Sequence, residues 1–403
     1  MSNKINNIFL FGLSILLIFA PVARGAVRIW STSVVLLVEA FLIFLWLWRA
    51  NNSNTYSFKR TKLDYPILIF AIIAVISFIF SIYKHDSFYA LIKLFGYIGI
   101  YYLVVNEFDH DMRKKLVWLI ISIGTAISTY GILQYLGILN REWWFPQGFL
   151  ASTYVNHNHF AGYLELVIPL AIVVLIRVVP KESSYKLIVV PFLVIMTTAF
   201  ILAQSRGAWF SLSISLAAMI VLLVKRGSIK RKNLIVILLL LAVVVSFIFF
   251  GKEVIAERLS SLSGMDEAES SAYTRFLIWQ GTVKLIAHNP LIGCGIGDFI
   301  WAFPRFRPEG LNVQANFAHN DYLQAAAEMG VFAPLVMIWI FWTIVASVAK
   351  QDKVDPIKIG CATGILSLAL HGLVDFNFHI PANMLLFTVF AAIVMSSSRS
   401  GEC

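Results

Sequence analysis

The sequence is poor in charge and in cysteine. Only 13% of its 403 residues are charged, and its three cysteines are Cys294, Cys361 and Cys403. Soluble domains carry about 25% charged residues, so a soluble globular protein is excluded. Three scattered cysteines form neither a disulfide framework nor a cysteine-rich metal site. The histidines and carboxylates also lack the short helical spacing of a metal site, so we expect chemistry without a metal or other cofactor.

Long apolar segments dominate the chain instead. Hydrophobic residues make up 59% of it, and the mean hydropathy is +0.80. Runs of about 17 to 25 apolar residues, long enough to span a bilayer, occur at 8–23, 32–48, 65–83, 88–106, 115–137, 159–179, 185–204, 207–224, 233–250, 326–349, 357–374 and 381–396. These runs predict an all-α polytopic integral membrane protein with about twelve transmembrane helices, in a single membrane domain over residues 1–403. The first run resembles a signal peptide, but we expect it to remain as a helix.

The basic residues predict the orientation in the membrane. With a cytoplasmic amino terminus, most of the Lys and Arg fall at the chain ends and in the connections on the cytoplasmic side, among them residues 59–62, 113–115 and 225–232. Cytoplasmic loops of membrane proteins carry such an excess. It accounts for the net charge of +10, so nucleic acid is not implied. Both termini are then cytoplasmic.

Two connections on the opposite side are long enough to carry chemistry. Residues 251–325 form a large external loop between the ninth and tenth runs, and external loops are where a multi-span protein places a site. Within it, residues 270–287 have the spacing of a helix lying in the membrane interface. The second segment, 138–158, is aromatic, and we expect Tyr154 and its neighbours at head-group depth.

Arg206 stands between two of these apolar runs. Only Ser205, Arg206 and Gly207 separate runs seven and eight, which puts the guanidinium at the outer boundary of the bilayer, where an unpaired charge is costly. The helix that begins there adds free backbone N–H groups, so we expect Arg206 to bind an anion. The alternative is an arginine that only reaches phospholipid head groups.

His319 precedes run ten at a predicted helix start. Asn320 or Asp321 can cap this helix, with Gln324 placed as in a capping box. A neutral imidazole at this point can accept a proton from a hydroxyl, because its unperturbed pKa of about 6.5 suits a general base. The alternative is a histidine that satisfies backbone groups.

Other charged residues are candidates for the same face. Arg275 lies early on the helix of the external loop and can close over the same anion. Arg305 and Arg307 are weaker candidates for the same contact. An ordinary interfacial cation is the alternative for each of them.

The apolar runs also contain polar residues. Glu165 lies about two turns into run six, after His159, and should face protein or a polar cavity rather than lipid. Asp375 and His379 stand near the mouth of run twelve and share this expectation. A buried structural pair is the alternative.

Four short motifs together resemble the O-antigen ligase and polymerase family. They are residues 155–165, 205–209, 273–276 and 319–324, and the resemblance extends over about residues 150–390. The ligase pattern begins with two residues that His319 and Asn320 match. Nine residues later it has a glycine, which Gly330 matches. Ala333 stands where that pattern has Gly, Thr or Tyr.

The resemblance implies a GT-C-like membrane glycosyltransferase of the bacterial inner membrane. Such enzymes move a glycan from an undecaprenyl diphosphate carrier to an acceptor hydroxyl on the periplasmic face, without a metal or a nucleotide. For a ligase of lipopolysaccharide biosynthesis the acceptor is lipid A-core. By similarity, Arg206 and Arg275 bind the diphosphate, and His319 activates or orients the hydroxyl. We expect further substrate contacts from Asn156, His157, His159, Glu165, Arg305, Asp321, Asp375 and His379.

Three alternative functions remain open. A polymerase uses a second carrier-linked glycan as acceptor, and a protein O-oligosaccharyltransferase modifies serine or threonine. A transporter of lipid-linked solutes belongs to a different class and predicts two related halves and broken helices at mid-membrane. The sequence has a single large external loop and no comparable halves.

Overall fold

The computed structural model describes residues 2–53, 56–139, 148–180, 185–226, 271–350 and 355–396. Its regular structure in these segments is helical throughout, with 14 α-helices. They are α1 (Ser2–Val22), α2 (Ile29–Asn51), α3 (Asp64–Ile79), α4 (Lys84–Glu107), α5 (His110–Tyr135), α6 (His157–Val173), α7 (Lys186–Leu202), α8 (Arg206–Lys225), α10 (Ser271–His288), α11 (Phe299–Ala302), α12 (Asp321–Met329), α13 (Phe332–Ala349), α14 (Pro356–His371) and α15 (Pro381–Met395).

Most of the predicted apolar runs form helices of membrane-spanning character. Seven helices in the described segments are long and apolar enough to cross a bilayer: α1, α2, α4, α5, α6 with its π-helical extension to Val178, α8 and α13. Four shorter apolar helices, α3, α7, α14 and α15, accompany them. The chain is therefore a polytopic membrane protein. The ninth run, 233–250, and the first part of the large loop lie outside the described residues.

The prediction of a single helix over 326–349 is wrong. The chain breaks at Gly330, which has φ +83° and separates α12 from α13. A Cβ at Gly330 would lie 2.1 Å from the carbonyl oxygen of Leu291. Glycine is required there, because other residues rarely adopt this conformation and none would leave room for the neighbouring backbone. The first turns of the predicted run therefore belong to α12.

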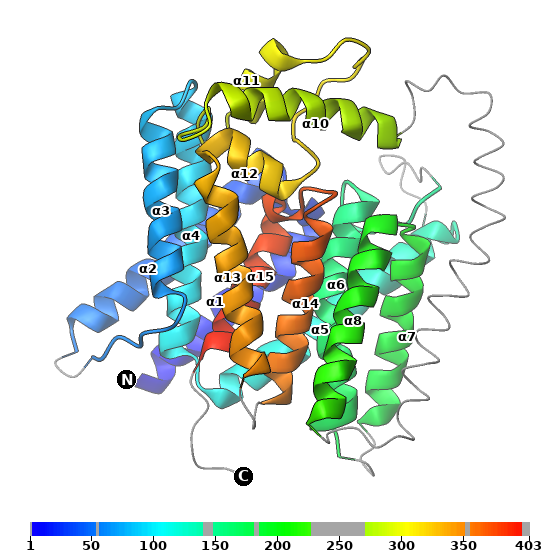
Figure 1. Ribbon diagram of the computed structural model, residues 1–403. Coiled ribbons are helices and arrows are strands. Elements are labelled where there is room, and N and C mark those ends of the chain that lie inside the picture. The colour runs from blue at the N-terminus through cyan, green and yellow to red at the C-terminus, as the bar shows by residue number, and fades with distance from the viewer. Residues whose placement is uncertain are drawn as a thin grey trace.

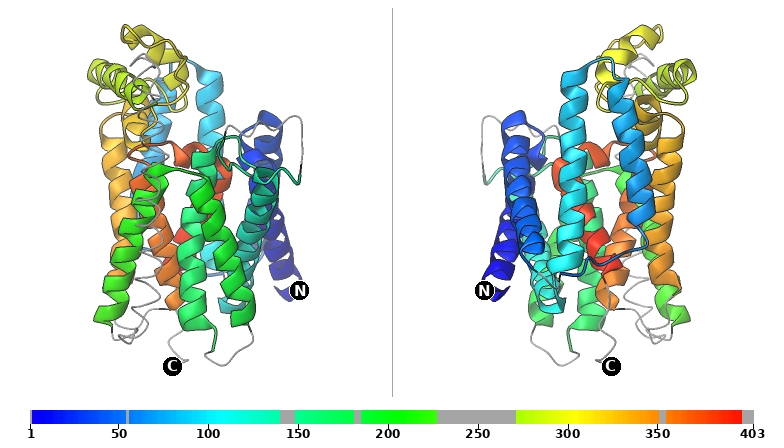
Figure 2. Two further views of the ribbon diagram at one scale, coloured as in Figure 1. Left: turned by 90° about the vertical axis from the view of Figure 1, so that its right-hand side faces the viewer. Right: turned by 90° about the vertical axis from the view of Figure 1, so that its left-hand side faces the viewer.

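The helices form an upright bundle that is covered at one end. In Figure 1, α3 and α4 stand on one side, α6, α7 and α8 on the other, and α13, α14 and α15 between them. α10, α11 and α12 lie across one end, which we call the α10 end, while α1 begins and α15 ends at the opposite end (Figures 1 and 2). The predicted loop helix 270–287 is thus confirmed as α10.

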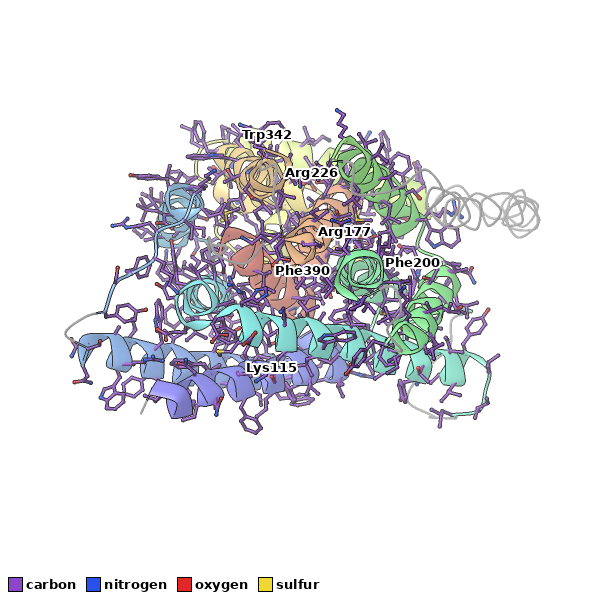
Figure 3. The ribbon with its side chains drawn as sticks, turned by 90° about the horizontal axis from the view of Figure 1, so that it is seen from below. Lys115, Arg177, Phe200, Arg226, Trp342 and Phe390 are labelled. Carbon is purple, nitrogen blue, oxygen red and sulfur yellow. The ribbon has the colours of Figure 1, made fainter. Side chains whose placement is uncertain are left out.

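Basic residues occupy the end away from α10. Figure 3, viewed from that end, shows Lys115, Arg177 and Arg226 around the bundle. Arg226 follows α8 and donates to the carbonyls of Val348 and Ala349 at the end of α13. All histidines except His110, by contrast, lie at or near the helix ends and loops on the α10 side.

Tyr154, from the aromatic segment that we expect at head-group depth, is buried by protein. It is 1% exposed, its hydroxyl is 3.2 Å from Asn383 Oδ1, and its ring contacts Phe160 and Tyr163. The residue fills the protein interior, because the start of α6 is packed inside the bundle rather than at its surface.

Candidate active site

Three side chains meet around the carboxylate of Asp375, which follows α14. Nδ1 of His319 is 3.9 Å and Nε2 of His159 is 3.6 Å from its Oδ1, and the Arg275 guanidinium is 3.6 Å from its Oδ2. Asp375 is 1% exposed, whereas the side chains of Arg275 and His319 are 27% and 30% exposed. We call these four residues the Asp375 cluster. It joins segments that are far apart in the sequence and presents two of its members to a ligand.

The start of α12 holds His319 against α14. The amide of Asp321 donates to the carbonyls of Gly372 and Asp375, and the Asn320 side chain donates to the carbonyl of Leu373. These bonds satisfy carbonyl groups at the carboxyl end of α14 that have no partner within the helix. Asn320 also caps α12 by accepting from the amides of Tyr322 and Leu323. Of the two predicted caps, Asn320 is therefore the one used, and His319 is fixed directly before it.

α10 holds the same loop from the other side. The indole of Trp279 donates to the carbonyl of Ala318, and Gln324 accepts from the amide of Ala318 rather than completing a capping box. Arg275 and Trp279 are four residues apart, so they share one face of α10. His319 itself has φ +50°, in the left-handed region that histidine occupies more often than most residues. The loop geometry therefore aims both the imidazole and the guanidinium at Asp375.

The electrostatics of the cluster keep His319 neutral. Burial lowers the pKa of His319 to about 4; Asp375 raises this pKa, while Arg275 and His159 lower it. For Asp375, burial alone would raise the pKa, but His159, His371 and Arg275 outweigh this effect and hold the pKa well below its usual range. A neutral imidazole beside an ionised carboxylate is the pairing that a general base requires.

The cluster is not closed by hydrogen bonds. Nδ1 of His319, Nε2 of His159 and Oδ2 of Asp375 are buried, and none of them has a hydrogen-bond partner among the described residues. Distances of 3.6 to 3.9 Å are longer than hydrogen bonds. Catalytic hydrogen bonds are often long before substrate binds and shorten in the complex. The distances from Asp375 to its three partners can shorten in this way.

Arg206 begins α8, as the sequence predicts. It is exposed and forms no ion pair with any described residue. Its neighbour Gly207 packs so closely on the turn after α14 that a Cβ would lie 2.8 Å from Val374 and 3.0 Å from His371. Arg206 therefore stands beside the segment that carries Asp375, with its charge free to meet an anion. The helix start adds backbone amides that have no partner within the helix, and one of them, that of Ala208, donates to the Ser205 cap.

Three other predicted residues, Glu165, Asp321 and His379, take part in two carboxylate–imidazole pairs. Glu165 Oε1 lies 3.1 Å from Nδ1 of His371 inside the bundle. Asp321 Oδ1 lies 3.0 Å from Nδ1 of His379, whose side chain is 30% exposed. Burial raises the pKa of Asp321, and His379 opposes this shift. Both pairs flank the Asp375 cluster, because Asp321 and His371 bond the turn at residues 372–375 through their backbones.

The remaining predicted contacts form none of the ion pairs of the cluster, although His157 lies near enough to Asp375, His159 and Arg275 to interact with their charges. Asn156 caps α6, and His157 bonds the carbonyl of Ala203 while it stacks on Phe149. Arg305 is exposed on the turn after α11 and has no ion pair within the described segments. These geometries give Asn156 and His157 structural partners and leave Arg305 apart from the other candidates.

Two features of the site were not predicted from the sequence. His371, the partner of Glu165, is four residues before Asp375, so the helical spacing of the two was the available signal. The stacked rings of Phe317 and Phe376, 4.3 Å apart, form a wall beside His319 and His159. Nothing in the sequence marked Phe317, because its ring meets Phe376 only in the folded protein.

Fold and site together define a polytopic helical membrane protein with a histidine, arginine and aspartate cluster at one end. Residues 191–338 match the family described as O-antigen ligase, Wzy_C, and so form a domain of that family. The match contains Arg206, Arg275 and His319 but ends before Asp375. No curated protein matches the chain. His159 and Asp375, from outside the matched region, complete the cluster.

Proposed function

We propose that the protein is an inverting, metal-independent glycosyltransferase of the O-antigen ligase type. It transfers a glycan from an undecaprenyl-diphosphate carrier to an acceptor hydroxyl at the periplasmic face of the bacterial inner membrane. The observation that carries this proposal is the meeting of Arg275 and His319 at Asp375, with Arg206 beside the same turn. The family match over residues 191–338 supports the same chemistry.

The transfer step uses these residues as follows. His319 removes the proton from the acceptor hydroxyl, whose oxygen attacks the anomeric carbon opposite the diphosphate. The bond from this carbon to the diphosphate oxygen breaks, and the carrier diphosphate leaves with the electron pair. Arg275 and Arg206 stabilise the charge that develops on this leaving group, so they favour the transition state over the ground state. Attack from the opposite face inverts the anomeric configuration.

Asp375 positions His319 and stabilises its protonated form. The carboxylate faces Nδ1 of the imidazole, which leaves Nε2 for the acceptor. Arg275 is shared, since it pairs with Asp375 when no donor is bound and is drawn toward the diphosphate when a donor arrives. This movement raises the proton affinity of His319, because Arg275 lowers its pKa and Asp375 raises it. Donor binding thereby prepares the base.

The proposed orientation places the α10 end in the periplasm and both termini in the cytoplasm. The basic residues at the opposite end support it. A lipid carrier keeps its isoprenoid chain among the helices and presents its head group at this boundary. Lipid A-core is the acceptor of a ligase, a second carrier-linked glycan that of a polymerase, and a protein hydroxyl that of an O-oligosaccharyltransferase.

The test is glycan transfer by the purified full-length protein. A polyprenyl-diphosphate glycan is supplied with lipid A-core, and released carrier diphosphate and glycosylated product are both measured without added metal. We expect His319→Ala, Arg275→Ala and Arg206→Ala to reduce transfer by roughly 10² to 10⁴-fold, the usual cost of losing a general base or an electrostatic contact to a leaving group.

Matched controls are available on α10 itself. Lys284 and His288 are exposed on the same helix as Arg275, outside the Asp375 cluster. Lys284→Ala and His288→Ala should retain transfer within about twofold. Full activity of the Arg275 and His319 variants would remove the site assignment, and counterflow of the lipid-linked glycan in proteoliposomes without transfer would favour a transporter.

A further inference from the structure

A second candidate site lies on the other side of α12 from the Asp375 cluster. A cavity of about 700 Å³ extends between α3, α4, α13 and α15, and residues of α12 line part of it. Along α4 it is lined by one helical face, which runs from His85 through Tyr89, Lys93 and Tyr97 to Tyr101. At ~1.5 Å per residue this face is about 24 Å long. The cavity is therefore an elongated channel, nearly as long as the ~30 Å hydrocarbon core of a bilayer.

The lining of the cavity changes along its length. Near the α10 end it contains the polar residues Asp86, Lys93, Asn316, Asp321, Gln324, Glu328 and His379. Toward the opposite end it is almost wholly apolar, with Leu63, Ile67, Ile98, Ile340, Phe387 and Ala391. A polar half above an apolar half matches a membrane amphiphile, whose chain avoids water while its head group requires polar partners. A water-soluble substrate would gain nothing from the inner half.

Lys93 supplies the cavity with a cation that forms no direct ion pair, although the carboxylates of Asp86 and Glu328, which also line the cavity, attract it. Its Nζ lies 4.9 Å from the ring centroid of Tyr89, and no carboxylate of the described residues is within ion-pair distance. Ionisable residues within spanning helices are rare and commonly mark a substrate path. Lys93 lies about 13.5 Å along α4 from its first residue, Lys84, at ~1.5 Å per residue. An anionic head group fits this position.

The cavity borders the Asp375 cluster at Asp321 and His379 but does not include it, since Arg275, His319 and Asp375 do not line the cavity. Phe317 lines it, and the stacked Phe376 behind Phe317 contacts His319 and His159. α13 lines the cavity, and α14 packs against both α13 and α8, the helix that Arg206 begins. A lipid chain in the cavity would therefore reach the Asp375 cluster from the side of α13 and α15, and a donor at Arg206 would reach it from the side of α8.

From this arrangement we infer that the cavity binds the apolar chain of a lipid-anchored acceptor that has an anionic head group. The inference rests on the proposed function. The chain lies along the inner half, Lys93 and His379 contact the head group, and the glycan of the acceptor extends beyond the aromatic wall to His319. A lipid-anchored acceptor is what a ligase or a polymerase uses, so the cavity argues against transfer to protein.

The experiment closes the cavity and follows lipid entry independently of transfer. Leu94 lines the cavity, whereas its neighbour Phe95 is exposed on α4 and does not. Leu94→Trp is therefore compared with Phe95→Trp in the full-length protein. The probe is phosphatidylglycerol with a photoreactive diazirine at the chain end, and labelling is read at Tyr97 and Tyr101, which are 8% and 3% exposed and line the cavity.

We expect Leu94→Trp to reduce labelling of both tyrosines and to raise KM for a lipid-anchored acceptor, each by about tenfold, equivalent to ~1.4 kcal/mol. Phe95→Trp should change neither by more than about twofold. Transfer to the same acceptor glycan without its lipid should be equal in both variants. Lys93→Met should remove any preference for the phosphatidylglycerol probe over the corresponding phosphatidylcholine probe.

The outcomes separate the two proposals. Undiminished labelling in Leu94→Trp would overturn the lipid site. Reduced labelling with an unchanged KM for the lipid-anchored acceptor would overturn the acceptor assignment alone. Normal labelling of a wild-type protein that transfers no glycan would overturn the proposed function, and the acceptor assignment with it.

Discussion

The two sides of the bundle differ in the surroundings of their charged residues. Around Asp375, side chains from α6, α10 and the loop before α12 lie within 4 Å of its carboxylate, and backbone hydrogen bonds anchor the start of α12 to the turn after α14. On the side of α3, α4, α13 and α15, a cavity of about 700 Å³ contains few polar groups, and Lys93 has no ion pair there among the described residues. The Asp375 side holds its functional groups in fixed positions, whereas the side of α3, α4, α13 and α15 contains a cavity.

This difference matches the two demands of a lipid-linked transfer. A reacting group must be held in a defined geometry, because a displacement of about 1 Å can cost roughly 10²-fold in rate. A lipid chain requires only an apolar channel, since the hydrophobic effect is non-directional. Substitutions should therefore act sharply on the Asp375 side, and on the cavity side only where they alter volume or charge.

The largest effect is expected from Asp375→Asn. The change keeps the shape of the side chain but removes the negative charge that faces His319 and Arg275. We expect kcat to fall by roughly 10² to 10⁴-fold, because both the orientation of the base and the stabilisation of its protonated form are lost. The KM for the donor should change much less, since Arg275 remains to bind the diphosphate.

A matched substitution on the other side sharpens the contrast. Asp86 lines the cavity and accepts from the indole of Trp301. Asp86→Asn should leave kcat within about threefold, because no reacting group depends on it. Equal losses in the Asp86 and Asp375 variants would contradict a division of the bundle into a rigid catalytic side and a tolerant lipid side.

The pH dependence should show a smaller effect of known sign. Because the pKa of His319 is lowered to about 4, the base stays neutral at higher pH, and kcat/KM should fall only as the pH drops through about 4. Arg275→Gln removes a group that lowers this pKa, so the residual kcat/KM of this variant should begin to fall at a higher pH. Asp375→Asn should move the start of this fall to a lower pH.

Stability should follow the same direction. The pKa of His319 is lower in the folded protein than its unfolded value of about 6.5. Its contribution to stability is therefore complete above pH 6.5 and is lost as the pH falls through about 4. Thermal unfolding of wild type and His319→Gln measures this contribution. If kcat/KM of the wild type instead fell near pH 6.5, the imidazole would not be desolvated as its burial indicates.

Much of the fold was accessible from the sequence because each apolar run had to be helical. In lipid, backbone groups have no water to bond, so helices satisfy them internally. The exception, residues 326–349, shows the limit of this argument. Hydropathy continues through Gly330, and only the approach of Leu291 from a distant segment makes the break necessary.

The candidate site was partly predictable for a different reason. Arg206 and His319 occur at helix starts, and such positions can be recognised locally from the neighbouring cap residues Ser205 and Asn320. The role of Asp375 as the meeting point could not be recognised in this way. It depends on how the turn after α14 packs against α10 and α12, and those contacts join residues about 100 and 55 positions apart.

The smallest effect is expected from weakening the loop that holds His319 rather than the residue itself. Asn320→Ala removes the cap of α12 and the bond to Leu373. The matched control is Asp109→Ala, which removes the cap of α5 at the opposite end of the bundle. Each should cost about 1 kcal/mol of stability. If the cap of α12 positions the base, only Asn320→Ala should also reduce kcat, by about three- to tenfold, because His319 is then less well oriented. Equal Tm losses with equal kcat in both variants would mean that the loop places His319 without help from its cap. Asn320→Asp, which retains the capping oxygen but not the donor to Leu373, should recover most of the rate and so identify capping as the cause.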